Sequence, residues 1–98
     1  MNSTYTFEAE PWLFHTGGWV FVSLPIHISQ QIRDMNRFPR KGFGSIRVEV
    51  AIGSSIWNTS IFPESKTGQY VMPIKKEIRR KEGVCVGEPV TVTIQVLD

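Results

Sequence analysis

Three side chains in the sequence could bind a metal ion or act as a nucleophile, namely His15, His27 and Cys85. A zinc site needs three or four ligands that converge in space, which two histidines cannot supply alone. Cys85 has no convincing base beside it and lies between two valines, so we expect a small buried apolar residue. The histidines are expected at a turn and before a helix, as surface or capping residues. The sequence thus predicts no catalytic residue, metal ligand or cofactor.

A second motif, Gly42-Phe43-Gly44, is similar to a glycine-rich phosphate loop. Such loops bind phosphate where they lead into a helix N-terminus, and a Gly-Lys-Ser/Thr sequence marks the commonest type. Here that sequence does not follow, and the next expected element is a strand. We therefore set a phosphate loop aside.

The densest cluster of charge consists of five basic residues on one predicted helix: Lys75, Lys76, Arg79, Arg80 and Lys81. Nucleic-acid phosphates bind such cations with an affinity that falls as salt rises. Against this reading, Glu77 and Glu82 interrupt the cluster, and no recognition helix or aromatic RNA-binding motif is apparent. An anion-binding or nucleic-acid-binding surface is the alternative to an ordinary solvated helix face.

Polar and aromatic residues also lie on the predicted middle strands: Arg47, Glu49, Trp57 and Thr59, with Trp19 and Tyr70 as further candidates. If Arg47 and Trp57 meet across a hairpin, they would line a concavity for a small anionic or planar ligand. Otherwise Trp57 packs in the core and Arg47 pairs with Glu49 or with a neighbour across the sheet. The pattern favours the second arrangement.

Alternation of apolar and polar residues, typical of strands with one buried face, dominates the chain. It predicts six strands: Tyr5–Phe14 interrupted by Pro11, Trp19–Leu24, Ile46–Ile52, Ile56–Phe62, Tyr70–Met72 and Val90–Val96. Trp19–Leu24 is apolar on both faces, as expected of a central strand. The turns are predicted at residues 15–18, which end in Gly17-Gly18, and at Gly53-Ser54.

Two short helices are expected between the strands. Their apolar stripes are Ile28, Ile32 and Met35 in the first helix and Ile74 and Ile78 in the second. Ser29 is a candidate N-cap of the first helix, and Gly83 is expected to end the second. A loop over Asn36–Gly44 follows the first helix.

A weak internal repeat accompanies these helices. Val22-Ser23-Leu24-Pro25-Ile26 and Val71-Met72-Pro73-Ile74 both run from a strand through proline into a helix, although their spacing differs by two residues. A true duplication would imply pseudo-twofold symmetry, and the sequence leaves this open.

The length of 98 residues, of which 41% are hydrophobic, suits one domain over residues 1–98 with a single core. One cysteine favours a reducing compartment. Neither a secretory leader nor a membrane-spanning apolar run is apparent, so we expect a cytoplasmic protein without a membrane partner. The net charge is only +2, but all eleven basic residues lie between positions 33 and 81. That bias indicates either a solvated surface or an anionic partner.

Segments across nearly the whole chain are similar to one bacterial and archaeal family. They include Phe7-Glu8-Ala9-Glu10, Gly17-Gly18-Trp19, Gly42–Val48, Trp57–Pro63 and Tyr70–Lys75 with Ile78-Arg79. The sequence resembles the domain-of-unknown-function family numbered nineteen hundred and five, of the double-split β-barrel class. Members often precede a helical domain of the bacteriocin-protection, OmpD-associated type, which this sequence does not contain. The resemblance implies the barrel, but no activity and no catalytic residues.

We therefore expect a mostly β fold, a small six-stranded double-split β-barrel, closed or half-closed, with two short helices, since closure covers the apolar faces and removes strand edges. No nucleophile, base and orienting group form a recognisable set. The leading hypothesis is a non-enzymatic binding or interaction module with a small-molecule or protein partner. A nucleic-acid-binding protein, or an enzyme whose residues meet only in the fold near Arg47 and Trp57, is the alternative.

Overall fold

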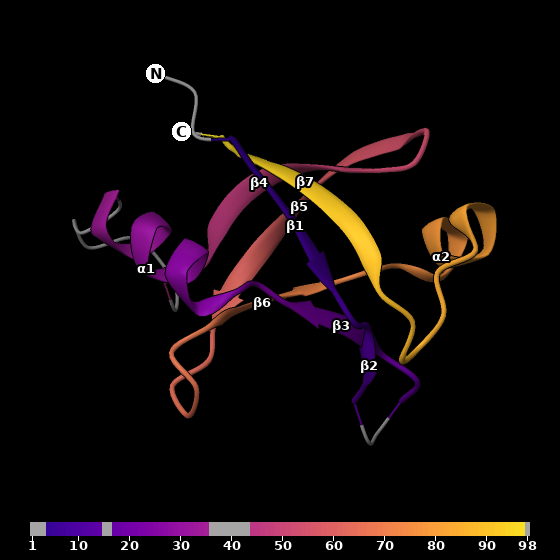
Figure 1. Cartoon of the computed structure of the whole chain (residues 1–98), viewed down its shortest axis with the longest axis horizontal. Coiled ribbons are helices and arrows are strands. Elements are labelled where there is room, and N and C mark those ends of the chain that lie inside the picture. Colours follow the sequence, from indigo (N-terminus) through magenta and orange to yellow (C-terminus); the bar gives the residue numbers. More distant parts are fainter. Residues whose placement is uncertain (1–3, 15–16, 36–43, 98) are drawn as a thin grey trace.

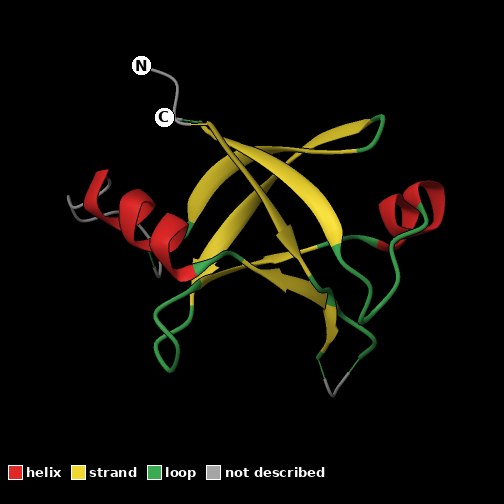
Figure 2. Ribbon diagram, viewed as in Figure 1, coloured by secondary structure: helices red, strands yellow, loops and turns green. Residues whose placement is uncertain are grey.

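Short strands dominate the computed structural model, which describes residues 4–14, 17–35 and 44–97 (Figure 1). The strands are β1 (Thr4–Ala9), β2 (Trp12–Leu13), β3 (Val20–Ser23), β4 (Ile46–Ile52), β5 (Ser55–Pro63), β6 (Tyr70–Pro73) and β7 (Val90–Val96). The helices are α1 (Ile26–Met35) and α2 (Lys76–Glu82). They flank the strands on two sides of the molecule (Figure 2). Within the described ranges, no helix has the length and apolar character that crossing a membrane requires.

The strands form one antiparallel sheet that curls into a half-barrel, in the order β1-β7-β4-β5-β6-β3-β2. The prediction of six strands is wrong, and of the closed and half-closed barrels that the sequence predicts only the half-closed one is found; Pro11 supplies the physical reason. Because proline has no N–H to donate, the first predicted strand breaks there: β1 pairs with β7, whereas β2 pairs with β3. The two sheet edges are thus consecutive pieces of the chain, and no ladder among the described residues joins them.

Alternate residues of the central strands fill the core. The inward residues of β4 and β7 are Ile46, Val48, Val50 and Ile52, with Val92 and Ile94 beside them. Burial of each such side chain contributes about 1.5–3 kcal/mol. The β4–β5 hairpin turns at Gly53-Ser54, where Gly53 has a φ of 57° and Ile52 lies opposite Ser55. The predicted inward faces and this turn are confirmed.

Helix α1 packs through Ile28 and Ile32, as predicted, but Met35 is exposed. The helix begins before the predicted position because the carbonyl of Pro25 already accepts the N–H of Ser29 (2.9 Å). Ser29 therefore lies inside the helix and is not its N-cap. Its buried hydroxyl donates to the carbonyl of Leu24 (3.3 Å) and accepts the N–H of Tyr70 (3.0 Å). These bonds attach α1 to β6.

Helix α2 ends as the sequence predicts. Gly83 adopts the left-handed conformation, with a φ of 67°, and its N–H donates to the carbonyl of Arg79. Ile74 and Ile78 are buried against the core. The helix is therefore a short element attached to the sheet by one apolar side and stopped by glycine.

The two halves of the chain repeat one topology around the β3–β6 pair, in which Val22 lies opposite Met72. Equivalent elements begin 50 positions apart: β3 at Val20 and β6 at Tyr70, α1 at Ile26 and α2 at Lys76. The neighbours correspond as well, since β2 pairs with β3 as β5 pairs with β6, and β1 pairs with β7 as β5 pairs with β4. The sequence repeat aligns Pro25 with Pro73, which are 48 positions apart. The structure instead makes Leu24 equivalent to Ile74, 50 positions apart, so the two-residue difference disappears.

Candidate functional site

The outer face of four neighbouring strands carries a row of flat apolar side chains. The flanking valines of β3 are buried in the core, so alternation places Phe21 on the outer face. Trp12 of β2 lies opposite Phe21 in the ladder, and Pro73 of β6 lies opposite it on the other side. Phe62 of β5 lies opposite Val71 of β6. The row therefore extends from β2 to β5.

The rings on one side of this row centre on Phe21. The ring centroid of Phe21 lies 5.2 Å from that of Trp12, 6.0 Å from that of Phe14 in an edge-on arrangement, and 6.3 Å from that of Trp19 at an interplanar angle of 19°. The indole N–H of Trp12 donates to Oγ of Ser23 (3.0 Å). Because such aromatic pairs contribute about 0.5–1.5 kcal/mol each, the rings hold one another in place.

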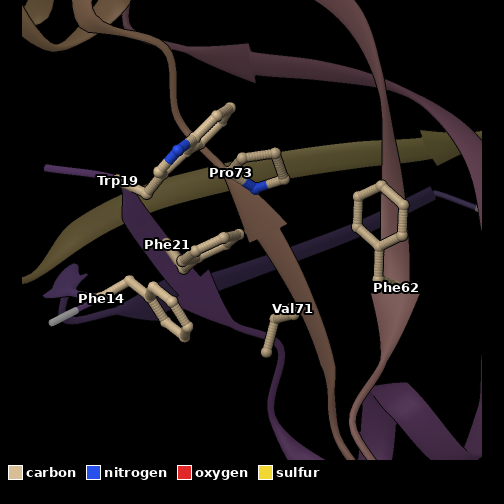
Figure 3. Close-up of a pocket in the computed structure, with 6 residues that line it drawn as sticks. All are labelled: Phe14, Trp19, Phe21, Phe62, Val71 and Pro73. Carbon is tan, nitrogen blue, oxygen red and sulfur yellow. The ribbon is translucent and has the colours of Figure 1, made fainter. Parts of the chain in front are cut away.

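Three of these rings, all except that of Trp12, border a cavity of about 500 Å³, which we call the aromatic hollow. Its lining residues are Phe14, Trp19, Phe21, Phe62, Val71 and Pro73. Figure 3 shows Phe62 across β6 from the three other rings. Trp19 is 59% exposed, Phe62 42% and Phe14 40%. A contiguous patch of exposed rings is the kind of surface that marks an interaction site.

Two further hollows adjoin the aromatic hollow, and Trp19 lines all three. The first, of about 240 Å³, lies between Gly17-Gly18 and the start of α2. The second, of about 310 Å³, is lined by Trp19, Trp57, Asn58, Thr59, Pro73 and Lys75. Lys75, Lys76 and Arg79 contribute the charges, and we call these three residues the cationic margin. Among the described residues, no carboxylate lines these three hollows, so the margin attracts anions.

Local backbone geometry fixes Trp19 and the cationic margin. Gly17-Gly18 adopt φ values of 73° and 70°, which side chains other than glycine rarely allow. After this turn, the carbonyl of Trp19 accepts the N–H of Phe14 (2.8 Å) and closes the β2–β3 hairpin. At the margin, Nε of Arg79 donates to the carbonyl of Ile74 (3.0 Å). The contact keeps the guanidinium beside the hollow.

The hollow beside Trp57 lies where β5 and β6 separate. In the described part, the two strands share two register pairs, Phe62 with Val71 and Pro63 with Tyr70. Beyond these pairs, Trp57 and Thr59 of β5 continue along β4, while β6 leads into α2. The opening between the strands is bounded by Trp19 and Lys75.

The structure brings together three of the six residues predicted for a pocket: Trp19, Trp57 and Thr59. Arg47 and Glu49 do not line this hollow. Arg47 lies opposite Ser60, and Trp57 lies opposite Val50, so Arg47 and Trp57 occupy opposite faces of the sheet and do not meet. Trp57 packs against the core, and Nη1 of Arg47 donates to Oγ of Ser60 (3.4 Å).

Tyr70, the sixth predicted pocket residue, belongs to the core. It is only 4% exposed because alternation along β6 turns Tyr70 and Met72 inward. The guanidinium of Arg33 lies 5.4 Å from the centroid of its ring. Tyr70 therefore holds α1 against the sheet and lines none of the three hollows.

The five basic residues predicted as one surface divide between different sites. Lys75, Lys76 and Arg79 form the cationic margin, whereas Lys81 lines another hollow with Glu77 and Ser54, which Lys75 also borders. Arg80 is exposed and is not among the residues that line the three hollows around Trp19. The division follows from helix geometry, since each residue advances about 100° around the axis.

The remaining sequence candidates do not gather into a site. Cys85 is exposed, so the prediction of burial is wrong: it lies in the loop after α2, where Sγ donates to the carbonyl of Gly83 (3.6 Å). His27 is exposed on α1, while His15 and residues 42–43 of the glycine motif lie outside the described residues. In the described ranges, no three His, Cys, Asp or Glu side chains are grouped to hold a metal ion.

Sequence reasoning missed most of the aromatic hollow: Phe14, Phe21, Phe62, Val71 and Pro73. One signal was present, because the segment Trp19–Leu24 is apolar on both faces. The pattern predicts a central strand buried on both sides. In the structure β3 is indeed internal to the sheet, but its outer face lines the aromatic hollow.

Nearly the whole chain matches one protein family. Residues 7–94 match the family described as Domain of unknown function (DUF1905), and the predicted resemblance is confirmed. No curated protein matches the chain. All residues that line the three hollows fall within the matched region. Since the match spans far more than half of the sequence, the chain belongs to the DUF1905 family.

Proposed function

We propose that this chain is a non-enzymatic binding module whose ligand combines a flat apolar group with a negative charge. The observation that carries the proposal is the position of Trp19, which borders the aromatic hollow on one side and the cationic margin on the other. A flat group in the aromatic hollow would thus have its charged end beside Lys75, Lys76 and Arg79. Binding sites commonly combine such apolar walls with a few polar groups that fix orientation.

The rings of the aromatic hollow are not needed to complete the core. The core contains the inward residues of the sheet with Ile28 and Ile32 of α1 and Ile78 of α2. Trp19 and Phe62 stand outside it and remain largely exposed. Since exposed rings gain little from folding, their clustering supports a role in binding.

Anilinonaphthalene sulfonate tests the proposal directly, because it carries flat rings and one negative charge. We expect the native protein to enhance its fluorescence in a saturable manner, and Trp19→Ala to weaken binding by about tenfold, as expected for the loss of a stacked ring. Val86→Ala is the matched control, since Val86 is 53% exposed and lines none of the three hollows. Equal binding by both variants, with circular dichroism unchanged, would contradict the proposed site.

The absence of enzymatic activity is a separate part of the proposal. Among the residues that the structure describes, no nucleophile paired with a base lines the aromatic hollow, and the side chains that do are hydrocarbon apart from the indole of Trp19. Screening against broad hydrolase and transferase substrates tests this part. Turnover that Trp57→Ala or Arg47→Ala abolishes would support an enzyme near those residues instead. We also propose a cytoplasmic location, supported by the free, exposed thiol of Cys85, which suits a reducing compartment.

A further inference from the structure

We infer that the ligand of this site is single-stranded nucleic acid, with unstacked bases on the exposed rings and phosphates along the cationic margin. The inference rests on the proposed function and specifies its ligand class. Proteins that bind single strands combine a positively charged groove with aromatic rings on which bases stack. Both parts are present here and share Trp19.

The chemistry of the lining matches bases better than aliphatic groups. Four of the six lining residues carry aromatic rings, a fifth is proline, and Val71 alone is a branched aliphatic residue. Flat rings offer stacking surfaces to any base, because every base has a π-face. Trp19 and Phe21 are nearly parallel, with centroids 6.3 Å apart, and Trp12 packs against Phe21, so the exposed ring of Trp19 rather than the space between the two rings is available for stacking.

The arrangement of charge matches a polymer that pairs each ring with a negative group. Lys75 lines both hollows that adjoin the aromatic hollow, and Lys76 and Arg79 extend the positive surface along one of them. A base stacked on Trp19 would therefore hold its phosphate beside Lys75. An acidic peptide also offers negative charge, but it does not carry a ring on every unit.

Double-stranded nucleic acid fits the site less well than a single strand. In a duplex the bases stack on one another, so their faces cannot reach Trp19 or Phe62 unless the bases leave the stack. Helix α2 has seven residues and lies at the margin of the aromatic face. The rings lie on the outer face of strands, as in sheet surfaces that stack RNA bases.

The test is fluorescence anisotropy of a labelled oligothymidine of about eight nucleotides, a length within the range that small strand-binding domains cover. We expect saturable binding to the full chain at low salt, with Trp19→Ala weakening it roughly five- to a hundredfold. Lys75→Ala with Lys76→Ala should weaken binding and also flatten the dependence of log affinity on log salt by about 1.4, the slope lost with two phosphate contacts. Arg47→Ala removes an exposed cation that lines none of the three hollows and should change neither quantity.

Three outcomes would overturn the inference. In the first, the oligothymidine does not bind at low salt. In the second, duplex of the same sequence binds as tightly as the single strand. In the third, an acidic aromatic peptide displaces the labelled oligothymidine but unlabelled strand does not. If anilinonaphthalene sulfonate still binds and depends on Trp19, the proposed function stands and only this ligand class fails. If neither compound binds, the proposed function fails as well.

Discussion

At the scale of single residues, Glu82 makes the contacts that hold α2 against the β4–β5 hairpin. Its carboxylate accepts hydrogen bonds from the hydroxyl of Ser55 (2.5 Å), the hydroxyl of Ser54 (3.2 Å) and the N–H of Ser54 (3.4 Å). The bond from Ser55 is the main cause that lowers the pKa of Glu82 below its ordinary value of 4.5. The Glu82 carboxylate thus joins α2 to the β4–β5 hairpin.

Glu82 should make part of the stability depend on pH. Because its pKa is lowered by folding, the stabilisation is complete above pH 4.5 and is lost as pH falls through the folded-state pKa. We expect Glu82→Gln to unfold more easily than the native chain at neutral pH and to lose less stability on acidification. Urea unfolding at pH 7 and near pH 3 measures both effects, and the exposed Glu49→Gln is the control. An unchanged acid dependence in Glu82→Gln would refute this role.

At the scale of elements, the sequence predicts best those strands that bury one face completely. The alternation in Ile46–Ile52 and Val90–Val96 identifies both strands and their inward residues, because an error of one position would expose every branched side chain. Local glycine chemistry likewise predicts the end of α2 at Gly83. Periodicity could not reveal that Pro11 divides the first strand between two partners, since pairing depends on distant residues.

The candidate site was predicted less completely than the strands, for a related reason. Trp19 and Trp57 were identified by residue type, but which residues join them depends on the face of each strand and on the separation of β5 from β6. Arg47 pairs across the sheet with Ser60 and Trp57 packs against the core, as in the arrangement that the alternation favours, and the alternative contact between Arg47 and Trp57 is not found. The aromatic hollow needs β2, β3, β5 and β6 side by side, which only the whole sheet provides.

The adjacent strands β4 and β7 should be intolerant of buried charge. Val48 and Val92 are fully buried, so Val48→Asp or Val92→Asp would place an unpaired carboxylate in the core. The cost of several kcal/mol is comparable to a typical domain stability of about 5–15 kcal/mol, and we expect unfolding. Circular dichroism and thermal melting measure the loss of structure. Lys76→Ala, on an exposed residue, should leave stability almost unchanged, and a cooperative native-like melt of Val92→Asp would contradict this account of the core.

At the scale of the whole molecule, the aromatic hollow lies at the junction of the two repeated halves. Phe21 and Val71 occupy equivalent positions of β3 and β6, and so do Trp12 and Phe62 on the strands beside them. The equivalence does not extend to charge, because α1 has no counterpart of the basic cluster beside Trp19. The two halves thus share a backbone plan, while only the second half supplies the cationic margin.

The repetition of the two halves means that the chain has two equivalent places to begin. Thr4 at the start of β1 lies opposite Gln95 near the end of β7, so the first and last strands of the chain have neighbouring ends (Figure 1). The position in the second half equivalent to the start of β1 is the Gly53-Ser54 turn before β5.

A circular permutant that starts at Ser55 and joins the old ends by a short glycine-serine linker would present its elements in the original topological order, with the halves exchanged. We expect it to fold cooperatively, with some loss of stability from cutting beside the Glu82 contacts, and chemical denaturation would measure that loss. The control is a permutant that keeps Ser54 and has a longer linker. If this permutant also failed to fold, the order of the two halves along the chain would matter more for folding than their shared topology.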